Sequence, residues 1–505
     1  MNFYTIHIFP RLIISVFLIA LISCNKLKNE KKKLPNIIFV FADDQRADAL
    51  SISQNPYIKT PNIDSLARNG VRFENCYVMG GHHGAICAPS RAMLLSGKSL
   101  FHVYDRLEGI ETLPNYLRSN GYQTFATGKW HNGAESFETN FQEGEQIMLG
   151  GMSDHFNVPV RDLNNNKLDN LNCKGFSTDI FADASLDYID KYQLSDKQKP
   201  FFCYIAFTAP HDPRSPAPSY LNAYSENEIP LPDNFKPLHP FIFDDFNVRD
   251  ETLAPWPRTP KDIQSSLSEY YALIQHIDDR VGDLISRLKE HNLYDNTLII
   301  YAADNGLAIG SHGLLGKQNL YEHSTKVPLI ISGPGIPKGQ TFSALVYLFD
   351  LFPTITDYLN FNQPQNIDGK SLMQLINGKK EEVRSSLYTA YRNTVRAIRN
   401  MDWKLIYYPQ INFKQLYNLK KDPNEINNLA NEIKYKFKVE EMMKLLKQHK
   451  EFSDDTINLN PYKLQSKEFD YKKLVQKLDP WQPQYIIDKY FPEGTSQKQA
   501  SVFCK

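Results

Sequence analysis

The sequence predicts an α/β protein with a mostly parallel central sheet flanked by helices and a smaller C-terminal α+β subdomain. First, short and nearly continuous apolar runs alternate with helical patterns, as expected for strands buried on both faces. Second, several of these runs end in polar side chains, which is where open α/β sheets place their sites. Third, shorter strands replace this pattern from about residue 366, before a helix predicted over residues 431–450.

Length and charge limit the function classes. A chain of 505 residues usually forms more than one structural unit. Lys plus Arg equals Asp plus Glu at 57 each, so the chain has no excess of basic residues, and we expect no nucleic-acid partner. The balance still permits a local anion site, because net charge does not describe one pocket.

The N-terminus has the features of an export signal. Arg11 precedes an apolar run over residues 12–22, which is shorter than the roughly 20 residues that span a bilayer. The Leu-Ile-Ser-Cys ending at Cys24 resembles a bacterial lipobox; the alternative is an ordinary signal with an incidental cysteine. We predict a signal peptide over residues 1–23, a lipidated tether over residues 24–34, and a membrane anchor on Cys24 in the periplasm or outer membrane.

The first strand is predicted over residues 36–42 and ends at Asp43 and Asp44. Two adjacent carboxylates after a buried strand repel each other, so their burial would require a cation or several donors. The alternative is a pair of solvated loop acids. A short helix follows, which opens at Pro61 and closes at Gly70.

Cys87 lies at the start of a predicted helix that ends at Gly97. Pro89 suits the first turn of this helix, because its missing N–H would be unpaired there. Cys87 therefore faces the positive end of the helix, with Arg91 about one turn away, and this combination suits a sulfate or phosphate. The alternative is a small buried thiol with no chemical role.

Three later apolar runs also end in polar groups. They cover residues 121–127, followed by Lys129 and His131; residues 201–208, followed by His211; and residues 297–303, followed by Asp304 and Asn305. Carboxyl ends of parallel strands share one edge of a sheet, so we expect these groups to converge near Cys87. Residues 327–332 form one more predicted strand, and residues 271–288 carry the periodicity of a long amphipathic helix.

The converging groups suit a metal-assisted site. Three carboxylates and an amide oxygen are hard ligands, which favour calcium or magnesium over zinc, and a larger irregular oxygen set favours calcium. Lys129, Lys317 and Arg91 would neutralise a bound anion. His131 and His211 have a pKa suited to proton transfer.

The run Cys-Ala-Pro-Ser-Arg-Ala-Met-Leu-Leu-Ser-Gly over residues 87–97 resembles the signature of type I sulfatases, in the alkaline phosphatase superfamily. Bacterial carbohydrate sulfatases belong to this group. Further motifs resemble the family's other site motifs, in the family's order: Asp43-Asp44-Gln45, Gly128-Lys129-Trp130-His131, Ala209-Pro210-His211, Asp304-Asn305-Gly306 and Gly316-Lys317. The resemblance covers roughly residues 35–430 and implies an alkaline-phosphatase-like fold, with a catalytic domain over residues 35–365 and a C-terminal subdomain and extension over residues 366–505.

The resemblance also implies a role for each site residue. A maturation enzyme would oxidise Cys87 to formylglycine, whose hydrate is the nucleophile. The implied calcium ligands are Asp43, Asp44, Asp304, Asn305 and oxidised Cys87. Arg91 and Lys129 would stabilise the hydrate, and His131 would assist collapse of the sulfated intermediate. His211 and Lys317 would bind the sulfate and protonate the leaving alcohol, and His312 is a weaker candidate.

Some residues depart from the family pattern or select the substrate. The pattern predicts an acidic residue where His323 stands and an arginine where Lys326 stands, which bears on loop packing or substrate shape. Arg214, Arg249 and Arg258 lie in a long segment after His211. They are candidates for binding a carboxylate or a second sulfate, or are incidental surface charges.

The leading hypothesis is an exported sulfatase that hydrolyses sulfate esters of a polysaccharide or oligosaccharide. One alternative is a phosphate mono- or diesterase of the same superfamily, which more often has a Ser or Thr nucleophile. Cys87 and Asn305 argue against it. The other alternative is a non-catalytic glycan-binding protein on the same scaffold, and the intact ligand set argues against that.

Overall fold

The structure is a computed structural model that describes residues 1, 33–195, 199–243, 248–468, 470–471 and 478–491. Two compact units are present, Met1–Pro35 and Asn36–Lys505, and the fold below is that of the second. The predicted signal peptide and the lipid attachment site at Cys24 lie outside the described residues. None of the helices in the described ranges is long and apolar enough to cross a bilayer.

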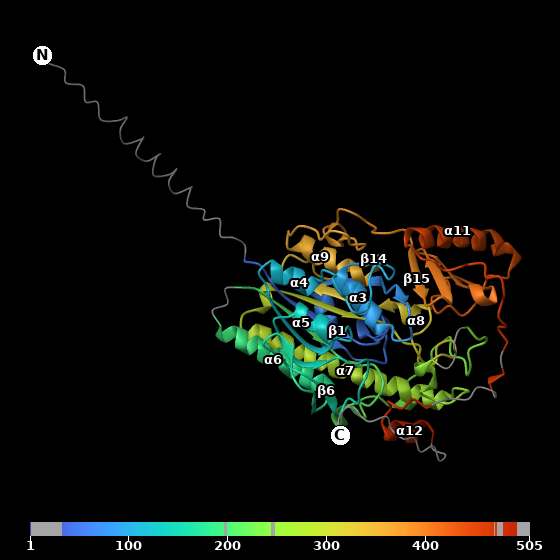
Figure 1. The fold of residues 1–505 in the computed structure, drawn as a ribbon, viewed down its shortest axis with the longest axis horizontal. Coiled ribbons are helices and arrows are strands. Elements are labelled where there is room, and N and C mark those ends of the chain that lie inside the picture. The colour runs from blue at the N-terminus through green and yellow to red at the C-terminus, as the bar shows by residue number, and fades with distance from the viewer. Residues whose placement is uncertain (2–32, 196–198, 244–247, 469, 472–477, 492–505) are drawn as a thin grey trace. The chain divides into compact units, whose positions relative to one another are not determined.

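A nine-stranded sheet forms the centre of the second unit (Figure 1). Its strands, in spatial order, are β12 (Lys326–Val327), β2 (Gly70–Tyr77), β13 (Leu329–Ser332), β11 (Thr297–Ala303), β1 (Asn36–Ala42), β10 (Phe201–Ala206), β4 (Gln123–Lys129) and β5 (Glu143–Met148), with β14 (Gln340–Tyr347) beside β2. Strand β1 is parallel to β11 on one side and to β10 on the other, and β10 is parallel to β4. The four strands predicted to end in polar groups are therefore adjacent and parallel, which confirms the predicted α/β class.

The other half of the sheet is mixed and was only partly predicted. The strand predicted over residues 327–332 is divided at Pro328, which has no N–H to donate to a ladder, into β12 and β13, and β12 begins one residue earlier, at Lys326. Strand β13 runs antiparallel to β11 and β2, while β14 runs parallel to β2. Strand β2 begins at Gly70, the residue that the sequence pattern identified only as the end of a helix.

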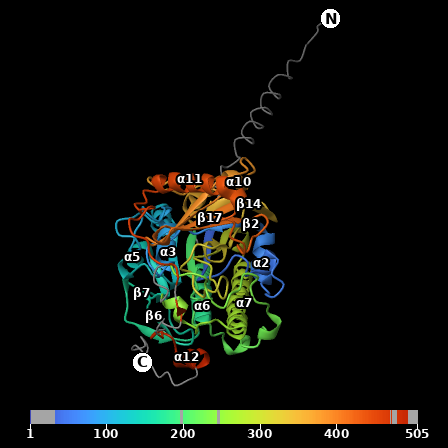
Figure 2. The same cartoon turned by 90° about the vertical axis from the view of Figure 1, so that its right-hand side faces the viewer.

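Helices cover both faces of the sheet (Figures 1 and 2). One face carries α2 (Pro61–Arg68), α6 (Ser177–Leu194) and α7 (Pro260–Glu290), and the other carries α3 (Cys87–Ser96), α4 (Leu113–Ser119) and α9 (Leu351–Tyr358). Helix α7 is the predicted amphipathic helix, and the Thr259 side chain caps it by accepting from the Asp262 N–H. Its apolar stripe is buried, and the helix packs on α2 and α6.

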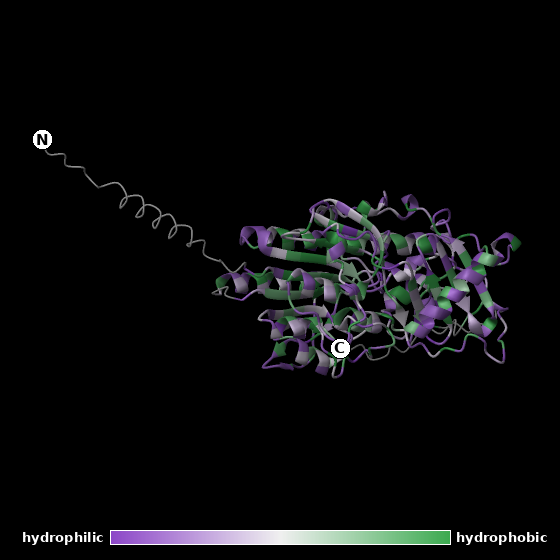
Figure 3. Cartoon of the chain, turned by 90° about the horizontal axis from the view of Figure 1, so that it is seen from above, coloured by the Kyte–Doolittle hydropathy of each residue, from purple (hydrophilic) through white to green (hydrophobic). Residues whose placement is uncertain are grey.

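The core follows the predicted hydropathy. Every residue of β1, β10 and β11 is buried, as expected for strands covered on both faces. Figure 3 shows strands in the middle of the protein in green, while the helices around them carry both green and purple residues. The apolar interior of the sheet therefore ends abruptly at the polar residues that follow each strand.

A second sheet of five strands follows in the C-terminal part. It contains β18 (Phe413–Asn418), β17 (Trp403–Tyr408), β16 (Val395–Arg399), β15 (Leu387–Tyr391) and β3 (Gly80–Gly81), in that order, and α11 (Lys436–Phe452) packs on it. Because β3 lies just before α3 in the chain, this sheet is joined directly to the Cys87 region. These are the predicted elements of a C-terminal α+β subdomain, whose boundary at residue 366 stays a prediction.

The remaining elements are short. They are α5 (Ala134–Asn140), α8 (Glu322–Thr325), α10 (Met373–Ile376), α12 (Gln484–Tyr490) and the two-stranded pairs β6 (Val158–Val160) with β9 (Asn172–Lys174) and β7 (Leu163–Asn164) with β8 (Lys167–Leu168). Helix α12 packs on α7, because Ile486 and Tyr490 share a buried cluster with Ile263 and Leu267. The C-terminal stretch therefore packs back onto the body of the second unit.

Strands β4 and β10 approach each other closely at Gly128, next to the site, and a substitution there tests this contact. It has φ of 93°, and a Cβ at this position would lie 1.9 Å from the Ala206 carbonyl oxygen of β10. We expect Gly128→Ala to lower the free energy of unfolding by about 3 kcal/mol, from left-handed strain plus overpacking. Gly378→Ala is the control, since φ is 67° there and the Cβ meets open space; we expect about 1 kcal/mol. Equal losses in urea titrations of both variants would contradict the close approach.

Candidate active site

The predicted residues converge on one edge of the sheet. Asp43 and Asp44 follow β1, Lys129 ends β4, and Asp304 and Asn305 follow β11. His211 lies five residues beyond β10, and Cys87 is the first residue of α3. Lys317 reaches the same place from the loop after β11. Each of these side chains is buried.

Cys87 occupies the centre of this group. Its Sγ lies 3.2 Å from Asp43 Oδ1, 3.7 Å from Asp44 Oδ1 and 2.9 Å from Lys317 Nζ. Burial, followed by the nearby Asp304 and Asp43 carboxylates, raises the pKa of the Cys87 thiol well above its ordinary value. The unmodified thiol is therefore protonated at neutral pH and is a poor nucleophile.

Asp43 is paired with two cations. Lys129 Nζ donates to Asp43 Oδ2, and Arg91 lies 3.9 Å from Asp43 Oδ1. Burial and the neighbouring Asp304 raise the pKa of Asp43 to about 6, so the carboxylate is still mostly ionised at pH 7.

Asp44 is paired with Lys317 and lies near His211. Lys317 Nζ lies 2.6 Å from Asp44 Oδ1 and 2.7 Å from Oδ2, and His211 Nε2 lies 3.6 Å from Oδ2. Burial works against the charged form of Lys317, but the Asp44 carboxylate raises the pKa of Lys317 well above its ordinary value. Lys317 is therefore an ammonium ion that touches both Asp44 and Cys87.

Asp304 fixes helix α3 to the end of β11. Its Oδ2 accepts from Arg91 Nε at 3.0 Å and lies 2.9 Å from Arg91 NH2. Its backbone carbonyl accepts from the Ser90 hydroxyl at 2.7 Å, and Arg91 NH1 donates to the Lys129 carbonyl at 2.7 Å. Ser90 and Arg91 of the signature therefore orient the helix that carries Cys87.

The cluster balances three buried carboxylates against three buried cations. The anions are Asp43, Asp44 and Asp304, and the cations are Arg91, Lys129 and Lys317. Charges removed from water require this compensation, because a single unpaired ion in the interior costs several kcal/mol. The result is a rigid polar site inside an otherwise apolar fold.

The donor set fits a hard divalent cation. Ligand atoms of Asp43, Asp44, Cys87 and His211 lie within 4.8 Å of one another. The Asn305 amide is also buried, and its nitrogen has no hydrogen-bond partner in the structure. Three of the predicted ligands, Asp43, Asp44 and Cys87, lie in this group, and Asp304 is bonded to it by the Asp44 N–H at 3.0 Å. The group also contains His211, which the sequence assigned to substrate binding. Carboxylate and amide oxygens are typical ligands of Ca²⁺ and Mg²⁺.

Two histidines border the cluster. Burial, together with Lys129 and Arg91, holds the pKa of His131 well below its ordinary value. Burial and Lys317 do the same for the pKa of His211. Both imidazoles are therefore neutral in the ligand-free protein, and an arriving anion would favour their protonation.

The arginines after His211 differ in their surroundings. Arg249 pairs with Asp212 and Asp250, and Arg258 pairs with Glu251, so protein carboxylates already bind these two guanidinium groups. Arg214 is buried, and its Nε has no hydrogen-bond partner in the described chain. His312, the weaker candidate, stacks on Tyr321 with ring centroids 3.9 Å apart and lies outside the charged cluster.

Asp212 is a site residue that the sequence analysis missed. Its carboxylate is buried, and its Oδ1 lies 3.2 Å from His211 Nδ1. Its position directly after a candidate catalytic histidine was the available signal, but a single Asp in a loop is most often solvated.

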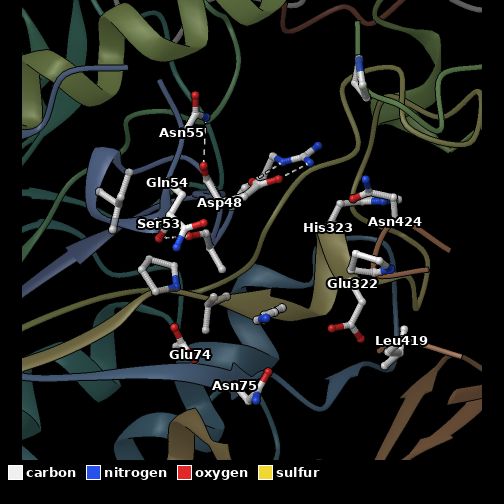
Figure 4. Close-up of a pocket in the computed structure, with 18 of the residues that line it drawn as sticks. Asp48, Ser53, Gln54, Asn55, Glu74, Asn75, Glu322, His323, Leu419 and Asn424 are labelled. Carbon is white, nitrogen blue, oxygen red and sulfur yellow. Dashed lines mark hydrogen bonds and ion pairs between the residues drawn. The ribbon is translucent and has the colours of Figure 1, made fainter. Parts of the chain in front are cut away.

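A separate groove with a volume of about 900 Å³ lies away from the cluster (Figure 4). In the view, two groups of labelled side chains face each other: Asp48, Ser53, Gln54 and Asn55 on one side, and Glu322, His323 and Asn424 on the other. His323 and Lys326, the two departures from the family pattern, both line it. Its arginines are paired, Arg46 with Asp48, Arg72 with Glu74 and Arg399 with Glu322. Lys326 and Lys420 also line the groove, but Asp233, Asp402 and Glu425 do so too, so carboxylates outnumber cations along its lining. The groove therefore has no excess of positive charge for an anion.

The fold and the site together define an enzyme that binds a small anionic group beside a buried nucleophile position. Residues 35–361 match the Sulfatase family model, and residues 310–452 match the model described as N-sulphoglucosamine sulphohydrolase, C-terminal. The chain belongs to the sulfatase family, whose members generally use formylglycine and a metal ion. It is a sulfuric ester hydrolase.

Several named relatives resemble the chain over most of its length. An N-acetylglucosamine-6-O-sulfatase of Bacteroides thetaiotaomicron is 27% identical, over 88% of this chain and 91% of that protein. An N-acetylglucosamine-6-sulfatase of Capra hircus is 30% identical, over 79% of this chain and 80% of that protein. The solved structure of BT4656 in complex with its substrate D-glucosamine-2-N,6-O-disulfate has a TM-score of 0.71 and 27% identity, and the match covers 84% of this chain and 99% of that one.

The charge balance of the cluster predicts a stability effect. Asp304→Ala leaves the buried Arg91 guanidinium without its main partner, so we expect the free energy of unfolding to fall by about 3 kcal/mol in metal-free buffer. Glu145→Ala is the control, because Glu145 pairs with Lys191 at the exposed surface; we expect less than about 1 kcal/mol. If urea titrations gave a similarly small loss of unfolding free energy for both variants, the Asp304–Arg91 pair would not contribute to stability, and the prediction would be wrong.

Proposed function

We propose that the chain hydrolyses sulfate esters of a carbohydrate through a formylglycine hydrate formed from Cys87, assisted by a calcium ion. The observation that carries this proposal is the environment of Cys87. Its Sγ lies at the N-terminus of α3, within 3.7 Å of Asp43, Asp44 and Lys317, yet burial keeps the thiol protonated. The position is suited to a nucleophile, but a protonated thiol is a poor one. We therefore take the position of Sγ as that of a hydroxyl group of formylglycine hydrate in the matured enzyme.

A hydrate explains how such a site turns over. One hydroxyl attacks sulfur and carries the sulfate, and the alcohol leaves. The second hydroxyl then loses its proton, the carbon–oxygen bond to the sulfate breaks, and the aldehyde forms again. Water restores the hydrate. A serine at the same position would keep a stable sulfate ester with no internal route to its release.

The residues around the hydrate divide the work. Asp43, Asp44, Asp304 and Asn305 would hold the cation, which would lower the pKa of the attacking hydroxyl and polarise a sulfate oxygen. Arg91 and Lys129 stabilise the hydrate. His131 takes the proton of the second hydroxyl, and His211 with Lys317 binds the sulfate and supplies a proton to the leaving alcohol.

Charge arithmetic supports an anionic substrate. The cluster without metal holds equal numbers of carboxylates and cations, so a bound divalent cation gives the site a net positive charge. A sulfate monoester carries one negative charge and is attracted to that site. Calcium is favoured because the oxygen donors are numerous and irregular.

A sulfated carbohydrate is the proposed substrate class. Two relatives are named for N-acetylglucosamine 6-sulfate chemistry, and the BT4656 structure contains a disulfated glucosamine. The predicted export signal and the lipid anchor on Cys24 fit an enzyme that meets polymers outside the cytoplasm. Maturation requires an enzyme that converts Cys87 to formylglycine.

The test compares matched aryl esters. Protein from a host that generates formylglycine should release sulfate from 4-nitrophenyl sulfate faster than phosphate from 4-nitrophenyl phosphate. It should also release sulfate from a 6-sulfated N-acetylglucosamine. The peptide that contains residue 87 should have the mass of formylglycine, and Cys87→Ala should lose activity by at least about 10³-fold.

Two outcomes would contradict the proposal. Faster phosphate release would indicate a phosphate esterase. Saccharide binding without turnover, by protein shown to carry formylglycine, would indicate a glycan-binding protein.

A further inference from the structure

His211 is oriented by its neighbour Asp212. His211 Nδ1 lies 2.7 Å from the Asp212 carbonyl oxygen and 3.2 Å from Asp212 Oδ1. Both atoms only accept hydrogen bonds while the carboxylate is ionised, so Nδ1 carries the hydrogen and donates it. His211 Nε2 then faces the cluster, 3.6 Å from Asp44 Oδ2. The orientation of this imidazole therefore depends on where Asp212 is held.

Asp212 is held by two side chains from distant parts of the sequence. Arg249 NH2 and Gln482 Nε2 both donate to Asp212 Oδ2, and Arg249 NH1 donates to Oδ1 at 3.1 Å. Burial alone would raise the pKa of Asp212, but Arg249 and His211 hold it well below its ordinary value. Asp212 is thus an ionised acceptor, fixed on both oxygens.

The C-terminal segment also fixes Arg249. Asp479 Oδ2 lies 2.8 Å from Arg249 Nε, and the Asp479 side chain is only 2% exposed. Asp479 and Gln482 belong to one turn, closed by the Gln482 N–H on the Asp479 carbonyl at 3.2 Å. One turn of chain therefore contacts both Asp212 and the arginine that pairs with it.

This turn is anchored to the body of the protein. Helix α12, which follows it, is bonded to α7 through Tyr490 and Ser266, whose hydroxyls lie 2.8 Å apart, and through the Lys489–Glu269 ion pair at 2.7 Å. Both family matches end before this segment, at residues 361 and 452. The turn lies outside the residues that the family models match, just before α12 (Figure 1). It reaches the site through the hydrogen bond from Gln482 to Asp212.

We propose that Asp479 and Gln482 are positioning residues for sulfate ester hydrolysis, which hold Asp212 and Arg249 so that His211 presents Nε2 to the leaving alcohol. The inference rests on the role proposed for His211. It assigns the C-terminal segment a part in turnover that the matched family regions do not contain. Removing a side chain that orients a metal-bound histidine typically costs about 10- to 100-fold in activity, and we expect a loss of that order for a histidine that supplies a proton.

The test uses Gln482→Ala with Gln484→Ala as its matched control. Gln484 is two residues away, and within the described ranges its side chain bonds to Asp488 on the exposed face of α12. With a 6-sulfated N-acetylglucosamine, we expect Gln482→Ala to lower kcat by about tenfold, with KM changed less than about twofold. With 4-nitrophenyl sulfate the loss should be much smaller, because nitrophenolate leaves without a proton. The control should match the wild type on both substrates.

A double-mutant cycle separates positioning from general damage. If Gln482 acts through His211, Gln482→Ala should have little further effect in a His211→Asn background, within about twofold. Equal losses on the two substrates, or a full loss that persists without His211, would overturn the inference. No loss in Gln482→Ala would overturn it too.

The experiment distinguishes failure of the proposed sulfatase function from failure of the positioning role alone. A wild-type protein that hydrolyses neither sulfate ester contradicts the role of His211 and this inference together. A wild-type protein that is active while the Gln482 variants behave like Gln484→Ala contradicts the inference alone. Thermal melting of each variant shows that the compared proteins are folded.

Discussion

The buried charge balance at the end of the central sheet is the constraint on which the rest of the structure depends. Asp43, Asp44 and Asp304 approach one another only because Arg91, Lys129 and Lys317 lie among them. Each cation arrives on a different element, so helix α3, strand β4 and the loop after β11 must dock correctly for any carboxylate to be tolerated. Formation of the site and formation of the fold are therefore coupled.

Much of this arrangement was predictable, because the carboxyl ends of neighbouring parallel strands lie at the same edge of a sheet. Residues 36–42, 201–206 and 297–303 are nearly continuous apolar runs, and each is fully buried in the structure. Parallel pairing brings their carboxyl ends to one edge, so the polar residues after them had to meet. The signature around Cys87 then supplied the chemistry that spacing alone left open.

The rest could not be predicted because it depends on tertiary contacts. Strand β2 carries Arg72, Glu74 and Asn75 within its apolar pattern, which weakens its signal, and β14 is placed by pairing with β2. Asp212 resembles any loop carboxylate until Arg249 and Gln482 are seen on it. The separation in sequence, 270 residues between Asp212 and Gln482, leaves no local pattern to detect.

Calcium binding by the metal-stripped protein tests the central claim most directly, because the claim is that this balanced cluster exists to hold a cation beside residue 87. Titration calorimetry at neutral pH should give one calcium site per chain, lost in Asp43→Asn. The Glu74→Gln variant, altered in the separate groove, should bind like the wild type. Absence of binding, or binding that survives Asp43→Asn, would contradict the account.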